Sequence, residues 1–595
     1  MTVEEWESTL DLQPLPPAPV VARRQVEAKR KEAQVMTDVI SRIVDLWSDM
    51  NPVVGYTSGR RKTLTALFKE TSDNLETMRA RIQDLHGDLD GTVDKDLRAT
   101  AGAVLTSLKT QLDLPRPSGA GPSGTGMGGV YAAADGVFYI VLKGDAKSPF
   151  VLQFLDSVLD IVIFETQRWW GQDFTILVRR ECVDTVTYME GTLQSLLQVR
   201  PDVKSKCDVI EKALTAYKAL FFIEGLDSND FNTYWPIFRE WDRIAGPAPA
   251  RGYPACLHNY YELTETATQI GIIAQGWLDL DMPVTTAITE QVATLPFVGS
   301  EGTLQAVWDK VTKHYSVDFG QWMDRVVKAC NDYGALYVIG HTKQDRVDFT
   351  ATPSYLVNLV TGGEDFAVDY LNPSTAYSQL YLTAAKNTSL LTMINILVHE
   401  ASHGFNFVLS AKYAGSPLLN LNTALEVPMT EGMAFYREFQ YWAAAQQLVG
   451  RSGLNPVQQA YLSLYGETPQ AQEQGVLCSQ LETYIWRVIR YVRALCDVKV
   501  NGGTMTYTDF IAWAAATTGL SEETLHGECF TFMASPGYAP CYAVGAASYA
   551  VLQKRGVAHG ITQIDFNTYA SRQGFYAWPL AKRLLGAYDP AKNVV

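Results

Sequence analysis

The sequence predicts a mainly α-helical protein with a small β-sheet. Apolar residues recur at helical spacing in most segments of the 595-residue chain. One segment, 376–384, instead alternates apolar and polar residues, as a β-strand does. It is followed by an apolar run from about Leu390, which predicts a buried helix. The other predicted helices are 22–49, 60–86, 97–112, 148–245, 261–277, 303–314 and 319–333.

The length exceeds what one hydrophobic core supports, so the chain is expected to divide into regions. A segment rich in Gly and Pro, 116–130, predicts a linker or mobile loop. It lacks the Gly-Lys-Ser/Thr of a phosphate-binding loop. We expect an N-terminal helical region (1–115), a helical scaffold lobe (131–345) and a catalytic lobe (346–595). Within the scaffold, 130–142 is expected to form a hairpin that turns at Asp135-Gly136.

The composition is that of an ordinary globular protein, with 47% apolar and 19% charged residues. The net charge of −15 and the pI near 5.1 make nucleic acid and anionic membranes poor partners. The longest apolar run, 151–164, is interrupted by Asp156 and Asp160, so no bilayer span is predicted. The eight cysteines form no C-x-x-C pair, and the N-terminus lacks the apolar core of a signal peptide. These features predict a cytoplasmic protein.

The apolar helix contains the motif His399-Glu400-Ala401-Ser402-His403, which reads H-E-x-x-H. Residues four apart share one helix face, so both histidines can bind one metal ion. Glu400 is then placed to take a proton from the attacking water. Burying two histidines and a glutamate in an apolar helix is costly without such a role. The motif predicts a Zn²⁺ site.

A catalytic zinc site usually has a third protein ligand. Glu431 begins a second apolar helix with the sequence Glu-Gly-Met-Ala-Phe-Tyr, which is similar to the third-ligand helix of the aminopeptidase branch of zinc peptidases. Glu426 is the alternative, but Pro428 indicates that it precedes the helix. Glu438 lies on the same helix face as Glu431, where it either hydrogen-bonds a ligand histidine or is solvated.

Other residues are candidates for substrate contact. The predicted strand 376–384, with Tyr381, either pairs with the substrate backbone at its edge or is only structural. Arg490 and Arg493 are three residues apart on a helix, and they either clamp a substrate carboxylate or form structural salt bridges. His526 is a further candidate donor to the oxyanion.

The C-terminal part carries a family resemblance. Arg490-Tyr491-Val492-Arg493-Ala494-Leu495-Cys496-Asp497 and Ser535-Pro536-Gly537-Tyr538-Ala539-Pro540-Cys541-Tyr542-Ala543-Val544-Gly545 follow the two metal motifs in order. With them, residues 370–560 resemble the bacterial family called domain of unknown function 885, regarded as zinc peptidases distantly similar to angiotensin-converting enzyme and thimet oligopeptidase. The resemblance implies a large two-lobed helical metallopeptidase-like fold with a sheet beside the active-site helix. It also implies a site deep between the lobes that admits short peptides or small amides.

By this resemblance Tyr542 falls on the tyrosine of the family's Pro-Gly-x-Ala-x-x-Tyr-x-x-Gly segment. Its hydroxyl would donate to the oxyanion, and Tyr538 is the neighbouring alternative. The chain departs from the family's first motif, His-Glu-x-x-Pro-Gly-His-His, because His403-Gly404 stand where Pro-Gly would be and Phe405-Asn406 replace the paired histidines.

The expected function is therefore zinc-dependent hydrolysis of a peptide or amide bond in a short substrate. His399, His403 and Glu431 would hold the metal, and Glu400 and Tyr542 would be catalytic. The altered motif leaves a second hypothesis, a specialised metalloenzyme acting on a non-peptide small molecule. A third is a binding protein without catalysis, against which the intact Glu400 argues.

Overall fold

The computed structural model describes residues 38–89, 94–114, 129–299, 302–357, 359–360, 363–383, 388–421, 423–558 and 560–586. The predicted linker lies almost entirely outside the described residues.

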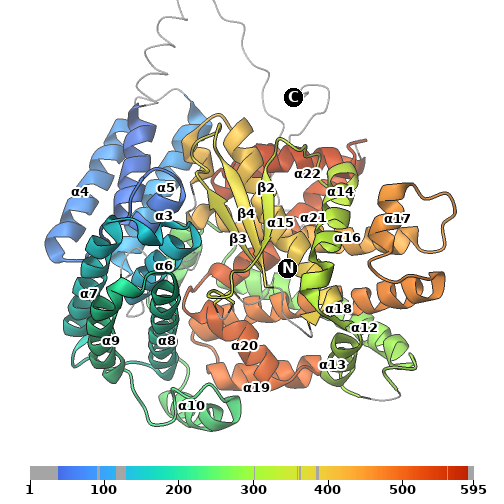
Figure 1. The fold of residues 1–595 in the computed structure, drawn as a ribbon, viewed down its shortest axis with the longest axis horizontal. Helices are drawn as coiled ribbons and strands as arrows, with labels where there is room; N and C mark the ends of the chain where they lie inside the picture. Colours follow the sequence, from blue (N-terminus) through green and yellow to red (C-terminus); the bar gives the residue numbers. More distant parts are fainter. Residues whose placement is uncertain are drawn as a thin grey trace, which may run out of the picture.

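Helices make up most of the described chain, which confirms the predicted mainly-α class (Figure 1). Residues 38–50 are helical. The following helices are α3 (Pro52–Thr57), α4 (Ser72–Asp88), α5 (Lys95–Asp113), α6 (Gly129–Leu142), α7 (Phe150–Trp169), α8 (Ile176–Val199), α9 (Lys204–Ala219), α10 (Phe231–Ala245), α11 (Tyr253–Ala255), α12 (Ala267–Ala293), α13 (Leu304–His314), α14 (Phe319–Tyr337), α15 (Leu390–Tyr413), α16 (Val427–Leu448), α17 (Pro456–Leu462), α18 (Pro469–Cys496), α19 (Tyr507–Thr518), α20 (Glu522–Met533), α21 (Tyr538–Ala558), α22 (Gln563–Arg572) and α23 (Trp578–Gly586).

Two small sheets complete the fold. Strands β2 (Val347–Ala351), β4 (Tyr377–Leu382) and β3 (Gly363–Val368) form one sheet in that order, and β1 (Ser316–Val317) pairs with β5 (Thr388–Ser389). Strand β4 runs parallel to β2 and antiparallel to β3. The expectation that the segment 376–384 offers an edge to the substrate is therefore wrong, because both edges of β4 are already paired. The outer edge near the motif helix belongs to β3.

Helix α15 carries the H-E-x-x-H motif through the centre of the molecule (Figure 1). The Ser389 side chain caps its first turn by accepting a hydrogen bond from the Thr392 N–H at 3.3 Å. The helix packs against β3, β4 and α16. A Cβ atom at Gly404 would lie 3.0 Å from the Asp365 carboxylate and 3.1 Å from Ser378. Glycine directly after His403 thus lets the sheet approach the motif closely.

Helices α16 and α21 cross at two glycines. A Cβ atom at Gly432 would lie 2.5 Å from the backbone of Gly545, and one at Gly545 would meet the backbone of α16. Only glycine permits this approach of two backbones. The crossing brings the start of α21 beside Glu431, which precedes Gly432.

The hairpin expected at 130–142 is wrong, since these residues form the helix α6. Asp135 and Gly136 lie in the middle of the helix, not in a turn. A Cβ atom at Gly136 would overlap the ring of Phe154 in α7, so the glycine serves close helix packing. Likewise, the helix expected from residue 60 begins only after Thr71, whose side chain caps α4.

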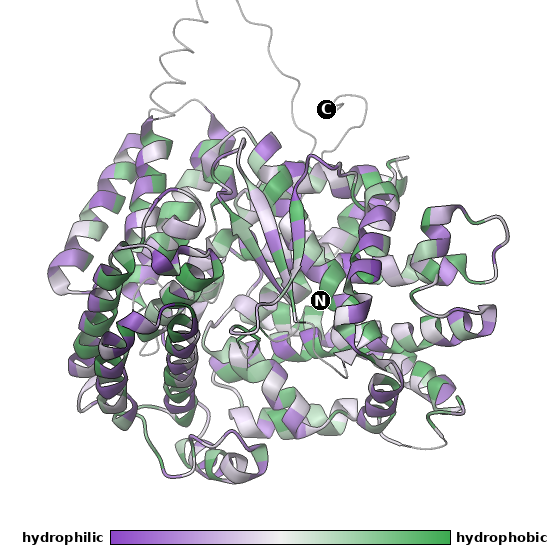
Figure 2. Ribbon diagram, viewed as in Figure 1, coloured by the Kyte–Doolittle hydropathy of each residue, from purple (hydrophilic) through white to green (hydrophobic). Residues whose placement is uncertain are grey.

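Hydrophobic core clusters join the regions expected from the sequence. One cluster combines buried apolar side chains from the segment between Val39 and Leu112 with Phe407, Leu425 and Phe575. Another combines buried apolar side chains of α6–α9 with Phe366 and Val368 of β3. The outer helices α7–α9 carry both hydrophilic and hydrophobic residues along their length (Figure 2). Among the described helices, none combines the length and hydropathy that a membrane span requires.

Candidate metal centre

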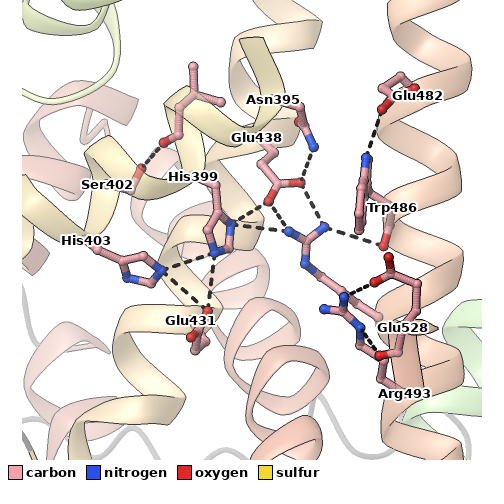
Figure 3. A network of polar contacts seen from close by, with 12 residues as sticks. Asn395, His399, Ser402, His403, Glu431, Glu438, Glu482, Trp486, Arg493 and Glu528 are labelled. Atoms are coloured by element: carbon pink, nitrogen blue, oxygen red, sulfur yellow. Dashed lines mark hydrogen bonds and ion pairs between the residues drawn. The ribbon is translucent and has the colours of Figure 1, made fainter. Parts of the chain in front are cut away.

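The two motif histidines and Glu431 converge on one point between α15 and α16 (Figure 3). The Nε2 atoms of His399 and His403 lie 3.1 Å apart. One carboxylate oxygen of Glu431, Oε2, lies 3.3 Å from His399 Nε2 and 3.5 Å from His403 Nε2. The three side chains are buried or nearly so.

These separations fit a zinc ion. Three ligand atoms held ~2.0–2.1 Å from a tetrahedral Zn²⁺ are ~3.3 Å apart, which is the mean spacing seen here. Glu431 Oε2 is buried and receives no hydrogen bond. A buried carboxylate oxygen without a donor is costly unless a cation is its partner. The donor set of two imidazoles and one carboxylate, with a fourth position left for water, is typical of catalytic zinc.

Glu438 fixes the orientation of His399 from the other side. Its carboxylate lies 2.6 Å from His399 Nδ1 and accepts a hydrogen bond from Asn395 at 3.2 Å (Figure 3). Arg490 donates to both oxygens of Glu438, with a distance of 3.0 Å to Oε2. A carboxylate on Nδ1 leaves Nε2 as the lone-pair donor that a metal needs. Of the two alternatives that the helix spacing left open for Glu438, the structure has the hydrogen bond with a motif histidine.

The electrostatics of this group favour positive charge at its centre. Burial lowers the pKa of His399, but the nearby carboxylates of Glu431 and Glu438 outweigh burial and raise it to about 9. Burial raises the pKa of Glu431, and the two histidines overcome this and hold it well below its usual range. The carboxylates that stabilise a proton on the imidazole would equally stabilise a divalent cation.

The two tyrosines at the start of α21 have different roles. Tyr538 donates its hydroxyl hydrogen bond to Glu431 Oε1, so it holds the carboxylate in place. The Tyr542 ring stacks beside His399, with centroids 6.5 Å apart. Among the described residues, no group hydrogen-bonds the Tyr542 hydroxyl. Burial and the charge of Glu431 raise the pKa of Tyr542 well above its usual value, so the hydroxyl keeps its proton and can donate it.

Glu400 follows His399 on the helix and is partly exposed. Within the described chain no donor pairs with its carboxylate. The strand β3 begins beside it, since a Cβ atom at Gly363 would lie 3.5 Å from Glu400 Cγ. Glu400 is therefore unengaged and borders the sheet edge.

The alternative ligand Glu426 lies outside the three-residue group. It ends a short 3₁₀ turn (Ala424–Glu426) just before α16, as Pro428 indicated. Burial, with the charge of Glu431, raises its pKa well above the usual value, and its Oε2 has no hydrogen-bond partner. The structure thus places Glu431, and not Glu426, against the two histidines.

Several predicted substrate contacts have other partners. Arg490 is engaged by Glu438, and Arg493 donates to the Glu528 backbone oxygen at 2.9 Å and to its carboxylate (Figure 3). A clamp that uses both arginines on one substrate carboxylate is therefore not formed. Tyr381 lies on the central strand and its hydroxyl donates to the Leu142 carbonyl at 3.4 Å. His526 packs among aromatic rings and contacts the Tyr507 hydroxyl.

Sequence reasoning missed Asn395 and the acidic pair Glu364 and Asp365. Asn395 lies four residues before His399 on the same helix face. This spacing predicts that Asn395 contacts the side chain that hydrogen-bonds His399, which is Glu438. Glu364 and Asp365 belong to a segment that looked irregular, and only strand pairing brings Asp365 beside α15 and turns Glu364 to the opposite face of the sheet.

The chain matches no family model and no curated protein. Two solved structures are similar over nearly their whole length. One is a "putative lipoprotein" from Colwellia psychrerythraea, with 12% identity and a TM-score of 0.59 over 94% of this chain and 98% of that one. The other is a "putative lipoprotein of unknown function" from Shewanella oneidensis, with 13% identity and a TM-score of 0.59 over 93% and 99% of the respective chains. At these identities the similarity concerns the fold.

Proposed function

We propose that the protein is a zinc-dependent hydrolase that cleaves a peptide or amide bond in a short peptide or small amide. The observation that carries the proposal is the group of three ligand atoms spaced 3.1–3.5 Å apart, with an unengaged glutamate one residue from the first histidine. The free hydroxyl of Tyr542 beside His399 supports it further.

Zn²⁺ bound here would act as a Lewis acid and lower the pKa of water. Glu400 takes a proton from the attacking water and passes it to the leaving amine. Tyr542 donates a hydrogen bond to the carbonyl oxygen as negative charge develops on it. Glu438 and Arg490 keep the imidazole of His399 aligned, and Tyr538 does the same for Glu431.

The outer edge of β3 is an open backbone edge beside Glu400 for an extended substrate. It starts at Gly363, next to Glu400, and its other edge is paired with β4. A peptide that adds to this edge would bring its backbone carbonyl past the metal ligands.

Metal analysis tests the proposal. Protein purified without chelator should contain about one zinc per chain. Glu431→Gln should lose zinc and activity, whereas the matched control Glu426→Gln should retain both, since only Glu431 lies against the histidines. Equal zinc content in the two variants contradicts the assigned ligand set.

A panel of short peptides and small non-peptide amides tests the substrate. Turnover of the peptides supports the proposal. Full zinc occupancy without peptide turnover favours the second candidate, a metalloenzyme acting on a non-peptide molecule, which the departure at Gly404-Phe405-Asn406 motivates. Zinc-loaded protein inert toward every amide favours a binding protein.

We also propose a reducing, cytoplasmic location. None of the eight cysteines forms a disulfide, and all are buried, as expected where thiols stay reduced. The names of the two similar structures point to a lipid-anchored location instead. Fractionation of the native cells decides between them, and recovery with the membrane fraction contradicts our proposal.

A further inference from the structure

A second polar group lies on the face of β3 away from α15. Tyr131, Asp135 and Tyr139 occur at intervals of four residues and share one face of α6. The Tyr131 ring lies 5.4 Å from that of Tyr188 in α8, and the Tyr139 ring stacks on Phe366 of β3 at 5.0 Å. The face is thus lined by aromatic rings from three elements.

Asp135 is only 4% exposed, yet half of its carboxylate has no partner. Its Oδ1 accepts a hydrogen bond from the Tyr188 hydroxyl at 3.0 Å, while Oδ2 receives none. A buried carboxylate oxygen left without a donor costs ~1–3 kcal/mol or more in stability. A buried carboxylate of this kind is retained where a bound partner supplies the missing hydrogen bond or counter-charge.

Glu364 belongs to β3, and its charge acts on Tyr131, Asp135 and Tyr139 of α6. It lies two residues before Phe366, so both side chains leave the same face of the strand. Among the described residues, no side chain pairs with its carboxylate. Burial and the charge of Glu400 raise the pKa of Glu364 to about 8, and burial raises that of Asp135 well above its usual value, with Glu364 adding to it. No basic side chain is among the groups that shift either pKa.

This group lies next to the metal centre. Gly363, which precedes Glu364, borders Glu400, and the charge of Glu400 acts on Glu364. A substrate bound along the outer edge of β3 would therefore pass from Glu400 toward Asp135 around the start of the strand.

We propose that Asp135 and Glu364, walled by Tyr131, Tyr139 and Tyr188, form a subsite for a positively charged organic group of the substrate, an ammonium or a guanidinium. As a substrate assignment it rests on the proposed function. The two carboxylates supply the missing counter-charge, and the ring faces attract an organic cation. A hard metal ion would prefer a cage of several oxygens to aromatic walls.

A matched pair of hydrolysis-resistant probes tests the subsite: benzylamine, which is charged at neutral pH, and benzyl alcohol, which is neutral. We expect benzylamine to bind ~10- to 100-fold more tightly, as measured by NMR titration of the full chain. Asp135→Asn and Glu364→Gln should each remove most of this preference and leave benzyl alcohol binding unchanged. Glu190→Gln, which removes a charge from the exposed side of α8, should change neither.

The same titration on zinc-depleted protein separates this subsite from the metal centre, because an amine also coordinates zinc. Retained benzylamine binding without zinc, in protein whose circular dichroism is unchanged, supports the subsite. Binding that disappears with the metal, an undiminished preference in Asp135→Asn, or no preference at all overturns it. A protein that prefers benzylamine but contains no zinc keeps the subsite and loses the proposed hydrolase function.

Discussion

Two groups of carboxylates lie on either side of β3, and their surroundings differ. Beside α15 and α16, Glu438 is satisfied by His399, Asn395 and Arg490, and Tyr538 donates to Glu431. Beside α6, Asp135 has one hydrogen bond from Tyr188, and none of the described side chains pairs with the Glu364 carboxylate. The chain itself supplies the hydrogen-bond partners of the first group, whereas it supplies too few for the second, the incomplete group.

The number of hydrogen-bond partners separates two kinds of carboxylate in the protein interior. A fully hydrogen-bonded network fixes geometry, as a metal ligand set requires. In that network Glu431 Oε2 is a carboxylate oxygen left without a hydrogen bond, and it lies 3.3 and 3.5 Å from the two Nε2 atoms. The incomplete group has its free oxygen on Asp135, and no basic side chain is among the groups that shift the pKa of this carboxyl. In both places the unpaired atom marks where we infer an external cation, a metal ion in one and an organic group in the other.

The largest expected effect concerns Glu400, which borders both groups. Glu400→Gln should lower kcat/KM by ~10²–10⁴-fold, because the proton acceptor is lost. Zinc content should stay at the level of the parent protein, since Glu400 is not a ligand. Steady-state kinetics with parallel metal analysis measure both, and equal activity in the two proteins rules out this mechanism.

Tyr542→Phe removes only the free hydroxyl beside His399. We expect kcat to fall by ~10²–10³-fold with little change in KM, as when one oxyanion donor is removed. Tyr538→Phe is the matched control. The Tyr538 hydroxyl donates to Glu431, so removing this hydroxyl should mainly lower zinc affinity. If Tyr542→Phe instead lost zinc affinity and Tyr538→Phe instead lowered kcat, the roles assigned to the two tyrosines would be wrong.

Glu438→Gln tests whether the satisfied network maintains the metal site. The variant removes the charge that aligns His399 and pairs with Arg490, so zinc affinity should fall by ~10- to 100-fold. Competition with a zinc chelator measures this. Glu528→Gln, which breaks the neighbouring ion pair with Arg493, should leave zinc affinity unchanged.

The smallest effect is on stability and concerns the incomplete group. The pKa of Glu364 is about 8 when folded against a usual value of 4.5, so the folded state binds the extra proton between these values. Its contribution to the free energy of unfolding is therefore full below pH 4.5 and is lost as pH rises to 8. A shift of this size corresponds to at most ~5 kcal/mol, which partial exposure of the side chain reduces to ~1–3 kcal/mol.

Urea unfolding across this pH window checks the effect. Glu364→Gln should flatten the decline in stability between about pH 5 and 8, relative to the parent protein. Glu467→Gln, whose carboxylate is 78% exposed, should leave the pH profile unchanged. A parent-like profile in Glu364→Gln contradicts the assigned pKa shift.

Sequence reasoning succeeded where local spacing decides contact. Four-residue spacing put His399 and His403 on one helix face, and the proline at 428 correctly placed Glu426 before α16. It failed where a glycine's packing decides structure. Asp135-Gly136 looked like a turn, but Gly136 fits under Phe154 within a helix. It also could not tell that the strand beside the motif helix would have both edges paired.

By itself the sequence determined the mainly-α class, the two histidines on one helix and the candidate third ligand, because these follow from periodicity along a single helix. Contacts in the folded chain decided which of the two tyrosines has a free hydroxyl, which carboxylates engage the two arginines and which strand has its open edge beside the motif helix. Those outcomes depend on contacts between residues far apart in the chain, such as Tyr538 with Glu431 and Arg490 with Glu438. The close crossing of α16 and α21 at Gly432 and Gly545 places the first of these contacts.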